Sequence, residues 1–122
     1  MNDISTPMMN LLEKALDVTS QRHKLVVANM ANIDTPGYQT QDLDFRGELT
    51  RAVAAGDNGR ASFLPVARSV PGLLERPDGN NVSMDREGLL LAETQMQFGL
   101  GIQLLQHEFH SILSAINEGG KV

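Results

Sequence analysis

The chain has 122 residues and a formal net charge of −5, so it can form one small domain at most, and its acidic balance argues against a nucleic-acid partner. Its apolar residues are mainly aliphatic, with four Phe, one Tyr and no Trp, which favours helix-on-helix packing over a sheet sandwich. The absence of Cys excludes disulfides and thiolate metal sites. The amino terminus lacks the pattern of a cleavable signal peptide, and no apolar run approaches the roughly 20 residues that span a bilayer.

The first predicted element is a long helix over residues 7–33. Thr6 can cap the free amides at its start, and Pro7 is tolerated at the first helical position. The helix must end near Ile33, because Thr35 precedes Pro36 and is therefore pushed out of the helical region. Alternating spacings of four and three predict a coiled-coil seam through Leu12, Leu16, Thr19, His23, Val26, Met30 and Ile33.

Residues 34–82 are predicted to be loop-rich, because they hold four of the five prolines and six of the eleven glycines. Within them, the stretch from Glu48 to Ala55 is expected to form two helical turns that end at Gly56. The stretch from Ala61 to Val70 is expected to supply a short strand or hairpin, which Pro65 confines to a sheet edge. Residues 76–81 are expected to form a surface turn.

The last predicted element is a helix over residues 83–118. Ser83 or Asp85 can cap its start, and the Gly119-Gly120 pair stops it. At 1.5 Å per residue this helix would be roughly 50 Å long, which is too long for a compact domain of this size. Its heptad seam is the clearest periodic signal in the sequence and consists of Leu91, Phe98, Ile102, Leu105, Phe109, Ile112 and Ile116.

The predicted fold is therefore mostly α, with two long terminal helices in an antiparallel coiled-coil-like pair and a loop-rich middle that holds a short hairpin. The first helix is shorter than the second, which would leave roughly 10 Å of apolar seam uncovered. That surplus favours a second chain as partner. A membrane surface is disfavoured, because the last helix has Arg86 and then no Lys or Arg before Lys121.

Candidate catalytic or metal-binding residues are few. His107 and His110 lie three apart on the last helix, whereas a zincin needs two His four apart around a Glu. A metal-dependent enzyme that uses these two residues is the weakest of the alternatives, and we expect no catalytic residue, cofactor, metal or small-molecule substrate. His23 lies on the first seam, where a packed and hydrogen-bonded imidazole is expected.

Residues 22–49, with the sequence RHKLVVANMANIDTPGYQTQDLDFRGEL, resemble the amino-terminal signature of flagellar basal-body rod proteins, and in particular the FlgB type of the proximal rod. Met30 replaces the usual Ile of the family's NIAN core, which is a volume-conserving change. The last helix departs from the pattern where relatives tend to carry an Asn and a Tyr, since this chain has Gln95 or Gln97 and then Phe98. Gly99 and Gly101 each cost about 1 kcal/mol relative to Ala. The resemblance marks as assembly residues Asn29, Ala31, Asn32, Thr35, Pro36, Gly37, Tyr38, Asp44 and Phe45.

The resemblance implies a structural subunit of the periplasmic rod in the flagellar basal body, which stacks through its terminal helices into a helical tube and transmits torque. It implies export through the flagellar type III channel without a cleavable signal. Its implied partners are copies of itself, other rod proteins and the adaptor between the export gate and the MS ring, without membrane insertion. Asn29, Asn32 and Tyr38 are expected where subunits meet. The rival interpretation is a soluble coiled-coil adaptor or export chaperone that binds one partner helix.

Overall fold

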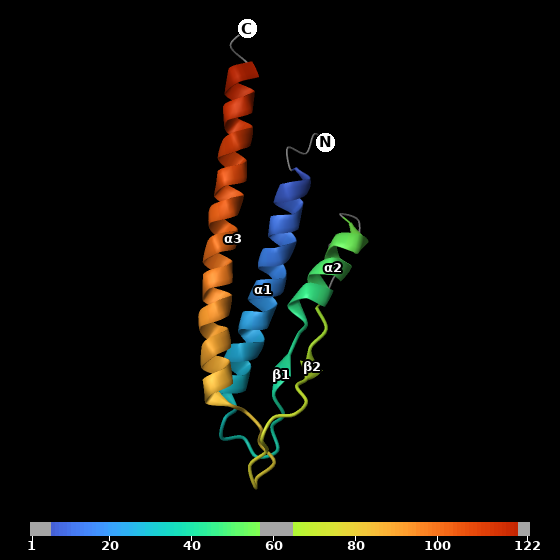
Figure 1. Ribbon diagram of the computed structural model, residues 1–122, viewed down its shortest axis with the longest axis vertical. Helices are drawn as coiled ribbons and strands as arrows, with labels where there is room; N and C mark the ends of the chain where they lie inside the picture. The colour runs from blue at the N-terminus through green and yellow to red at the C-terminus, as the bar shows by residue number, and fades with distance from the viewer. Residues whose placement is uncertain (1–5, 57–64, 120–122) are drawn as a thin grey trace.

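The structure is a computed structural model that describes residues 6–56 and 65–119. In these residues the elements follow in the order α1 (Pro7–Ala31), β1 (Gln41–Asp42), α2 (Phe45–Ala55), β2 (Arg68–Ser69) and α3 (Met84–Gly119). Figure 1 shows an elongated molecule in which α1 and α3 run side by side in opposite directions, with α2 against the other flank of α1. The predicted fold, mostly α with an antiparallel pair of terminal helices, is confirmed.

The start of α1 has the expected cap. The Thr6 hydroxyl accepts a hydrogen bond from the Met9 amide at 3.1 Å, and Pro7 occupies the first position of the helix. The helix ends at Ala31, two residues before the expected position. A tight turn follows, in which the Tyr38 amide donates to the Thr35 carbonyl at 3.2 Å. Gly37 has a φ of +75°, which the third position of a type II turn requires.

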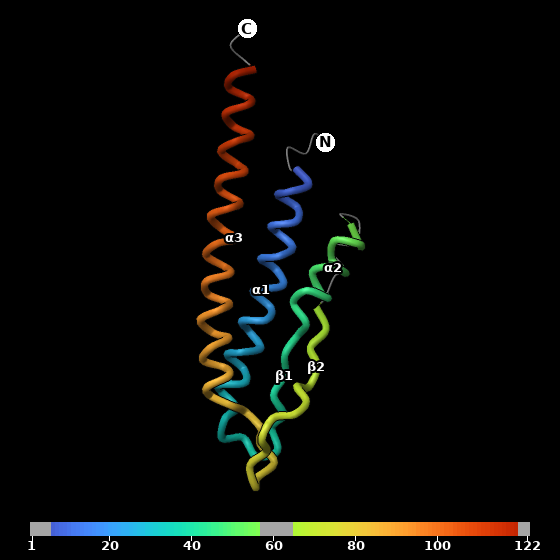
Figure 2. The backbone as a smooth tube through the Cα atoms, in the orientation of Figure 1, coloured from blue at the N-terminus to red at the C-terminus, as the bar shows by residue number. Residues whose placement is uncertain are grey.

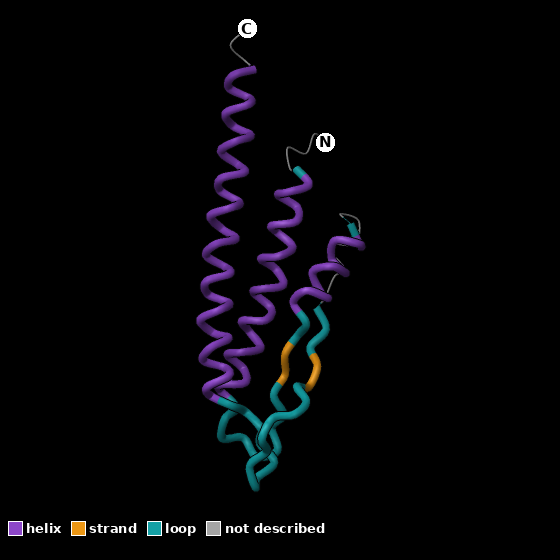
Figure 3. The backbone as a smooth tube through the Cα atoms, viewed as in Figure 1, coloured by secondary structure: helices purple, strands orange, loops and turns teal. Residues whose placement is uncertain are grey.

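The middle of the chain is more regular than the sequence indicates. Helix α2 begins at Phe45, three residues before the predicted segment, and ends at the expected Gly56. Strands β1 and β2 form an antiparallel ribbon in which Gln41 faces Ser69 (Figure 3). β2 lies in the stretch predicted to hold a strand, although Phe63 and Leu64 of that stretch fall outside the described residues. β1 consists of only two residues, and both are polar. No alternation of apolar and polar residues therefore predicts this strand.

The two long helices differ in length, and this difference places the end of α3 beyond α1. Helix α3 begins at a cap in which the Arg86 amide donates to the Ser83 hydroxyl at 3.2 Å. It contains 36 residues against 25 in α1, a difference that corresponds to roughly 16 Å of helix. Figure 2 shows the last turns of α3 rising past the first turn of α1. These turns have no partner helix in the chain as described.

The core is small and unusually polar. Its buried apolar side chains come from α1, α2, the start of α3 and the segments between them, and are Leu12, Val18, Val26, Leu43, Ala52, Val82 and Leu90. Slightly more polar than apolar side chains are buried, among them Asn29, Asn80 and Glu87. Such groups are tolerated in a core only when they are hydrogen-bonded. In the described part of α3, no side chain beyond Thr94 is buried.

Across the described residues, no helix combines the length and the hydropathy that crossing a bilayer requires.

Candidate functional site

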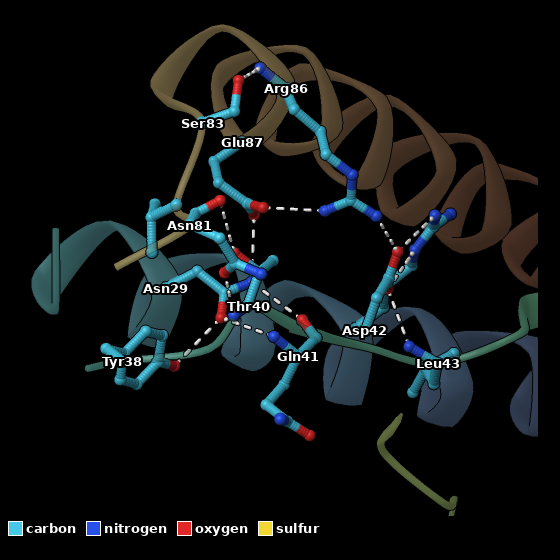
Figure 4. Close-up of polar contacts among 12 residues, drawn as sticks. Asn29, Tyr38, Thr40, Gln41, Asp42, Leu43, Asn81, Ser83, Arg86 and Glu87 are labelled. Atoms are coloured by element: carbon cyan, nitrogen blue, oxygen red, sulfur yellow. Dashed lines mark hydrogen bonds and ion pairs between the residues drawn. The ribbon is translucent and has the colours of Figure 1, made fainter. Parts of the chain in front are cut away.

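Several residues of the segment that resembles the rod-protein signature lie at the closed end of the helix pair, where the chain leaves α1 and later enters α3. We call this region the junction; it comprises the last turns of α1, residues 35–43, and residues 76–87. Figure 4 shows side chains from these separate segments pointing toward one another. The junction is therefore a place where distant parts of the sequence are joined by polar contacts.

Asn29 is the centre of the junction and is only 1% exposed. Its Nδ2 donates to the Gln41 carbonyl at 2.8 Å and to Oε2 of Glu87 at 3.2 Å. Its Oδ1 accepts from the Tyr38 hydroxyl at 2.9 Å and from the Gln41 amide at 3.1 Å (Figure 4). An amide side chain has two donor hydrogens and one carbonyl acceptor, and all of them are used here. One residue of α1 thus fixes β1, the Tyr38 turn and the start of α3.

Within this chain, Asn29 and Asn32 form hydrogen bonds to groups of the same chain. Both were expected to reach a neighbouring subunit, but Asn29 is enclosed by its own chain. Asn32 bonds locally: its Nδ2 donates to the Ala28 carbonyl at 2.7 Å, and its Oδ1 accepts from the Thr35 hydroxyl at 3.0 Å. The reason is that the turn through Gly37 carries residues 38–41 back along α1.

Asp42 connects three elements through ion pairs. Its carboxylate accepts from Nε and Nη2 of Arg22 on α1 at 3.0 and 3.1 Å, and from Nη2 of Arg86 on α3 at 2.7 Å. Nη1 of Arg86 pairs with Oε1 of the fully buried Glu87 at 2.7 Å. We call Arg22, Asp42, Arg86 and Glu87 the ion cluster. Sequence reasoning did not single out this cluster, because its members are far apart in the chain and share no spacing signal.

The environment of the ion cluster shifts two pKa values. Burial acts to raise the pKa of Asp42, but hydrogen bonds from Arg22, Leu43 and Arg86 and the positive charge of Arg22 outweigh it, so the pKa lies below its ordinary value. The hydrogen bond to Asp42 raises the pKa of Arg22. Both groups therefore stay charged in the folded chain near neutral pH.

Tyr38 is affected by the same surroundings. Burial raises the pKa of its phenol, and the negative charge of Glu87 adds to the shift. The phenol therefore keeps its proton, and so its hydrogen bond to Asn29, across the neutral range.

Side chains of the turn before α3 form hydrogen bonds with the turn after α1. Nδ2 of Asn80 donates to the carbonyls of Asn32 and Thr35, both at 2.9 Å. Oδ1 of Asn81 accepts from the Thr40 amide at 2.6 Å. The Arg76 guanidinium donates to the Ile33 carbonyl. These side chains satisfy backbone groups at the end of α1, which otherwise would lack partners.

Gly79 allows this close approach to the turn through Gly37. Gly79 has a φ of +86°, and a Cβ built on it would lie 3.3 Å from the Gly37 Cα. The Gly37 amide donates to the Asp78 carbonyl at 2.8 Å. The Pro36-Gly37 motif of the sequence thus serves a contact between two turns of the same chain.

The other signature residues are peripheral to the junction. Asp44 precedes α2, and its carbonyl accepts from the Glu48 amide at 2.8 Å, while Phe45 is half-buried as the first residue of α2. The exposed members of the signature are Ala31, Thr35, Pro36, Gly37 and Asp44.

The predicted seam of α3 lies beside α1 and is only partly covered by it. The side of α3 that meets α1 carries Thr94, which is 3.1 Å from Nδ1 of His23, and Gly101, which lies against Leu16. Along α1, the seam residues Leu12 and Val26 are buried, and Leu16 and Met30 are half-buried. Along α3, Leu91, Leu105 and Ile112 are half-buried, whereas Phe98, Ile102, Phe109 and Ile116 are 37–54% exposed.

Two hollows follow the line between α1 and α3. One has a volume of about 320 Å³ and is lined by Thr19, Ser20, His23, Thr94, Gln95 and Phe98. The other has about 410 Å³ and is lined by Met9, Glu13, Leu105, Gln106, Phe109 and His110. Their residues repeat at helical spacing on both helices, so the two hollows lie on one side of the pair, and we call them together the groove. From Thr94 to His107, α3 carries no Asp, Glu, Lys or Arg.

The two histidines considered as metal ligands are both exposed on α3. Within residues 6–56 and 65–119, no three His, Asp or Glu side chains lie close enough together to hold a metal ion.

No protein-family model matches this chain. It is 31% identical over 125 residues to the "Flagellar basal body rod protein FlgB" of Salmonella typhimurium, with 88% of this chain and 91% of that protein covered. The protein of the same name in Escherichia coli is 29% identical over 88% of this chain and 91% of its own length. That of Borrelia hermsii is 31% identical over 85% of this chain and 91% of its own.

A pair of long terminal helices closed by a polar junction, together with relatives that match over nearly the full length, places the chain in the class of flagellar basal body rod proteins. Within that class, the chain belongs to the FlgB family.

Proposed function

We propose that this chain is a structural component of the flagellar basal-body rod and that its terminal helices assemble into a helical tube that transmits torque. The names of its FlgB relatives support the rod assignment. One observation carries the assembly step: α3 extends past α1 and presents large apolar side chains that nothing in the described chain covers. The following paragraphs argue this step from the surface of α3.

The exposed surface of α3 is apolar over most of its length. Leu89 and Met96 are 70% and 71% exposed, and Leu100 is 55% exposed. Large apolar side chains exposed to this extent mark the helix as an interaction site. The other exposed apolar residues of α3 are Phe98, Ile102, Leu104, Phe109, Leu113 and Ile116.

The occupant of this surface is a helix. The seam from Leu91 to Ile116 keeps heptad spacing, and heptad seams are filled by knobs from another helix. The groove between α1 and α3 has the same direction and is flanked by Phe98 and Phe109. Terminal helices of neighbouring rod subunits, either copies of this chain or other rod proteins, have the required shape.

Such contacts are heterologous, because one subunit supplies a groove and its neighbour supplies a helix. Heterologous contacts that do not close into a ring produce a helical assembly, which is the geometry of a tube. The junction then has a mechanical role. Its ion cluster and the Asn29 contacts hold α1, β1 and α3 at fixed angles, so torque applied to one helix reaches the other.

The proposal includes the remaining expectations for a rod subunit. The chain reaches the periplasm through the flagellar type III export channel without a cleavable signal and does not insert into the membrane. Its neighbours include the adaptor between the export gate and the MS ring. It performs no catalysis and needs no cofactor or small-molecule substrate.

The test uses a strain of the source bacterium that lacks the gene for this chain. Wild-type protein supplied in trans restores motility and is present in purified hook–basal bodies. Ile102→Glu, which places a charge on the exposed seam, abolishes both. The matched control is Gln103→Glu, which adds the same charge one position further along α3 at an exposed polar residue and preserves assembly.

Two results would contradict the proposal. One is a chain that restores motility while absent from purified basal bodies and present in a small stoichiometric complex, which is the behaviour of an adaptor or export chaperone. The other is an Ile102→Glu variant that folds, as judged by its helical content, and still assembles normally.

A further inference from the structure

Helix α3 contains two glycines at its midpoint, and they have different surroundings. At Gly101, an added Cβ would lie 2.7 Å from Cδ2 of Leu16, so the missing side chain makes room for α1. At Gly99, an added Cβ would meet nothing within 4 Å. Packing within the chain therefore explains Gly101 and does not explain Gly99. Both residues lower the intrinsic stability of the helix at this point.

The contacts that hold α3 to the rest of the chain differ on the two sides of these glycines. Before them, Glu87, Leu90 and Thr94 are buried, and Arg86 belongs to the ion cluster. After them, no described side chain of α3 is buried. In this later part, Glu108 accepts a hydrogen bond from the hydroxyl of Thr6, the residue that caps α1, at 3.1 Å. We call residues 84–94 of α3 the base and residues 102–119 the arm.

We propose that Gly99 and Gly101 form a hinge at which α3 bends as an intact helix, so that the arm swings away from α1 while the base stays fixed in the junction. Leu16 against Gly101 and Thr6 with Glu108 are among the contacts that hold the closed form. Opening widens the groove beside Phe109 and exposes the seam of α1 around Leu12, which is 9% exposed in the closed form.

This inference does not depend on the rod assignment, because it rests on contacts within one chain. A competing explanation for Gly99 is that a neighbouring helix approaches it closely in an assembly. The two explanations differ for the isolated chain: a hinge affects the conformations of the monomer, whereas a contact site affects only the assembled form.

The chain has no Cys, so pairs of introduced cysteines can be labelled selectively with nitroxides and their separation measured by pulsed electron resonance. One pair reports on the arm and replaces the exposed residues Met8 and Ser111. A second pair reports on the base and replaces the exposed residues Gln21 and Gln95. Both pairs are measured in the full-length monomer at a concentration where it does not self-associate.

The hinge predicts a broad distribution of distances, with a long-distance component, for the arm pair and a narrow one for the base pair. Gly99→Ala narrows the arm distribution and lowers the long-distance fraction at least twofold. Gly88→Ala is the matched control, because Gly88 is also exposed with nothing within 4 Å but lies in the base. It leaves both distributions unchanged. Gly101→Ala displaces Leu16 and raises the long-distance fraction.

Hydrogen exchange on the same samples distinguishes bending from unfolding. The hinge requires amides of residues 104–116 to stay protected above unfolded rates. The inference is overturned if Gly99→Ala leaves the arm distribution as broad as in the wild type, if the wild-type distribution is already narrow, or if the arm amides exchange at unfolded rates.

Discussion

The hydroxyl of Tyr38 donates a hydrogen bond to Oδ1 of Asn29 at 2.9 Å, and both residues come from the segment that carries the FlgB resemblance. The motif therefore has a physical explanation within one chain: its asparagine and tyrosine connect the end of α1 to the turn that follows. Asn29 then continues the connection to Glu87 on α3. Under the rod proposal, the junction fixes the two helices in the position that a neighbour meets, and the following predictions test the junction.

Asn29→Leu is expected to lower the free energy of unfolding by about 3 kcal/mol. Leucine has a similar volume but cannot bond Gln41 or Glu87, and a buried group that loses its partner costs about 1–3 kcal/mol, or more when charged. Chemical denaturation followed by circular dichroism measures the change. A loss below 0.5 kcal/mol, on the order of an ordinary surface substitution, would show that Asn29 does not hold the junction.

The phenol of Tyr38 is expected to titrate above its ordinary pKa of 10.0 in the folded chain, because burial and the charge of Glu87 oppose ionisation. Tyr38 is the only Tyr and the chain has no Trp, so the rise in ultraviolet absorbance of the phenolate reports this group alone. A folded pKa above the unfolded one means that stability falls as pH rises past 10.0. Equal midpoints in native buffer and in denaturant would contradict the buried position of the ring.

Asp42 makes stability depend on acid pH. Its folded pKa lies below the ordinary 3.8, so the unfolded chain takes up a proton first and stability declines as pH falls below that value. Asp42→Asn removes the charge that Arg22 and Arg86 bind. We therefore expect the difference in unfolding free energy between wild type and variant to be largest near neutral pH and to shrink toward pH 2. A difference that stays constant over this range would exclude the ion cluster as its source.

Gly79→Ala is expected to destabilise the junction more than Gly72→Ala does. Both glycines have positive φ, for which a side chain costs roughly 1–2 kcal/mol. Only Gly79 also faces the Gly37 backbone at 3.3 Å, whereas a Cβ on Gly72 would meet nothing within 4 Å. The thermal unfolding midpoints of the two variants give the comparison. Equal midpoints would mean that the two turns do not need their close contact.

Sequence periodicity predicted the terminal helices well, because Thr6, Pro7 and Gly119 are local signals and a heptad repeat extends over many residues. It predicted less well which side of α3 would meet α1. Leu91 and Phe98 were chosen as seam because they are apolar, yet Thr94 and Gly101 are the residues that face α1. Close helix approach favours small residues, and a hydrophobic pattern gives them no weight.

The junction could not be derived from spacing at all. Asn29 and Glu87 are 58 positions apart, and Arg22 and Asp42 are 20 apart. Their pairing depends on the turn through Gly37, which reverses the chain, and on the register of α1 against α3. The resemblance located the segment but suggested contacts between subunits for a residue, Asn29, that the chain uses internally.

The most direct test of the rod proposal is an electron cryomicroscopy map of hook–basal bodies purified from the source bacterium. The proposal predicts density for this chain within the rod, with the α3 surface around Ile102 and Phe109 packed against a helix of a neighbouring subunit and the Asn29–Tyr38 contact retained. A rod that lacks the chain, or one in which that surface of α3 faces solvent, would contradict it.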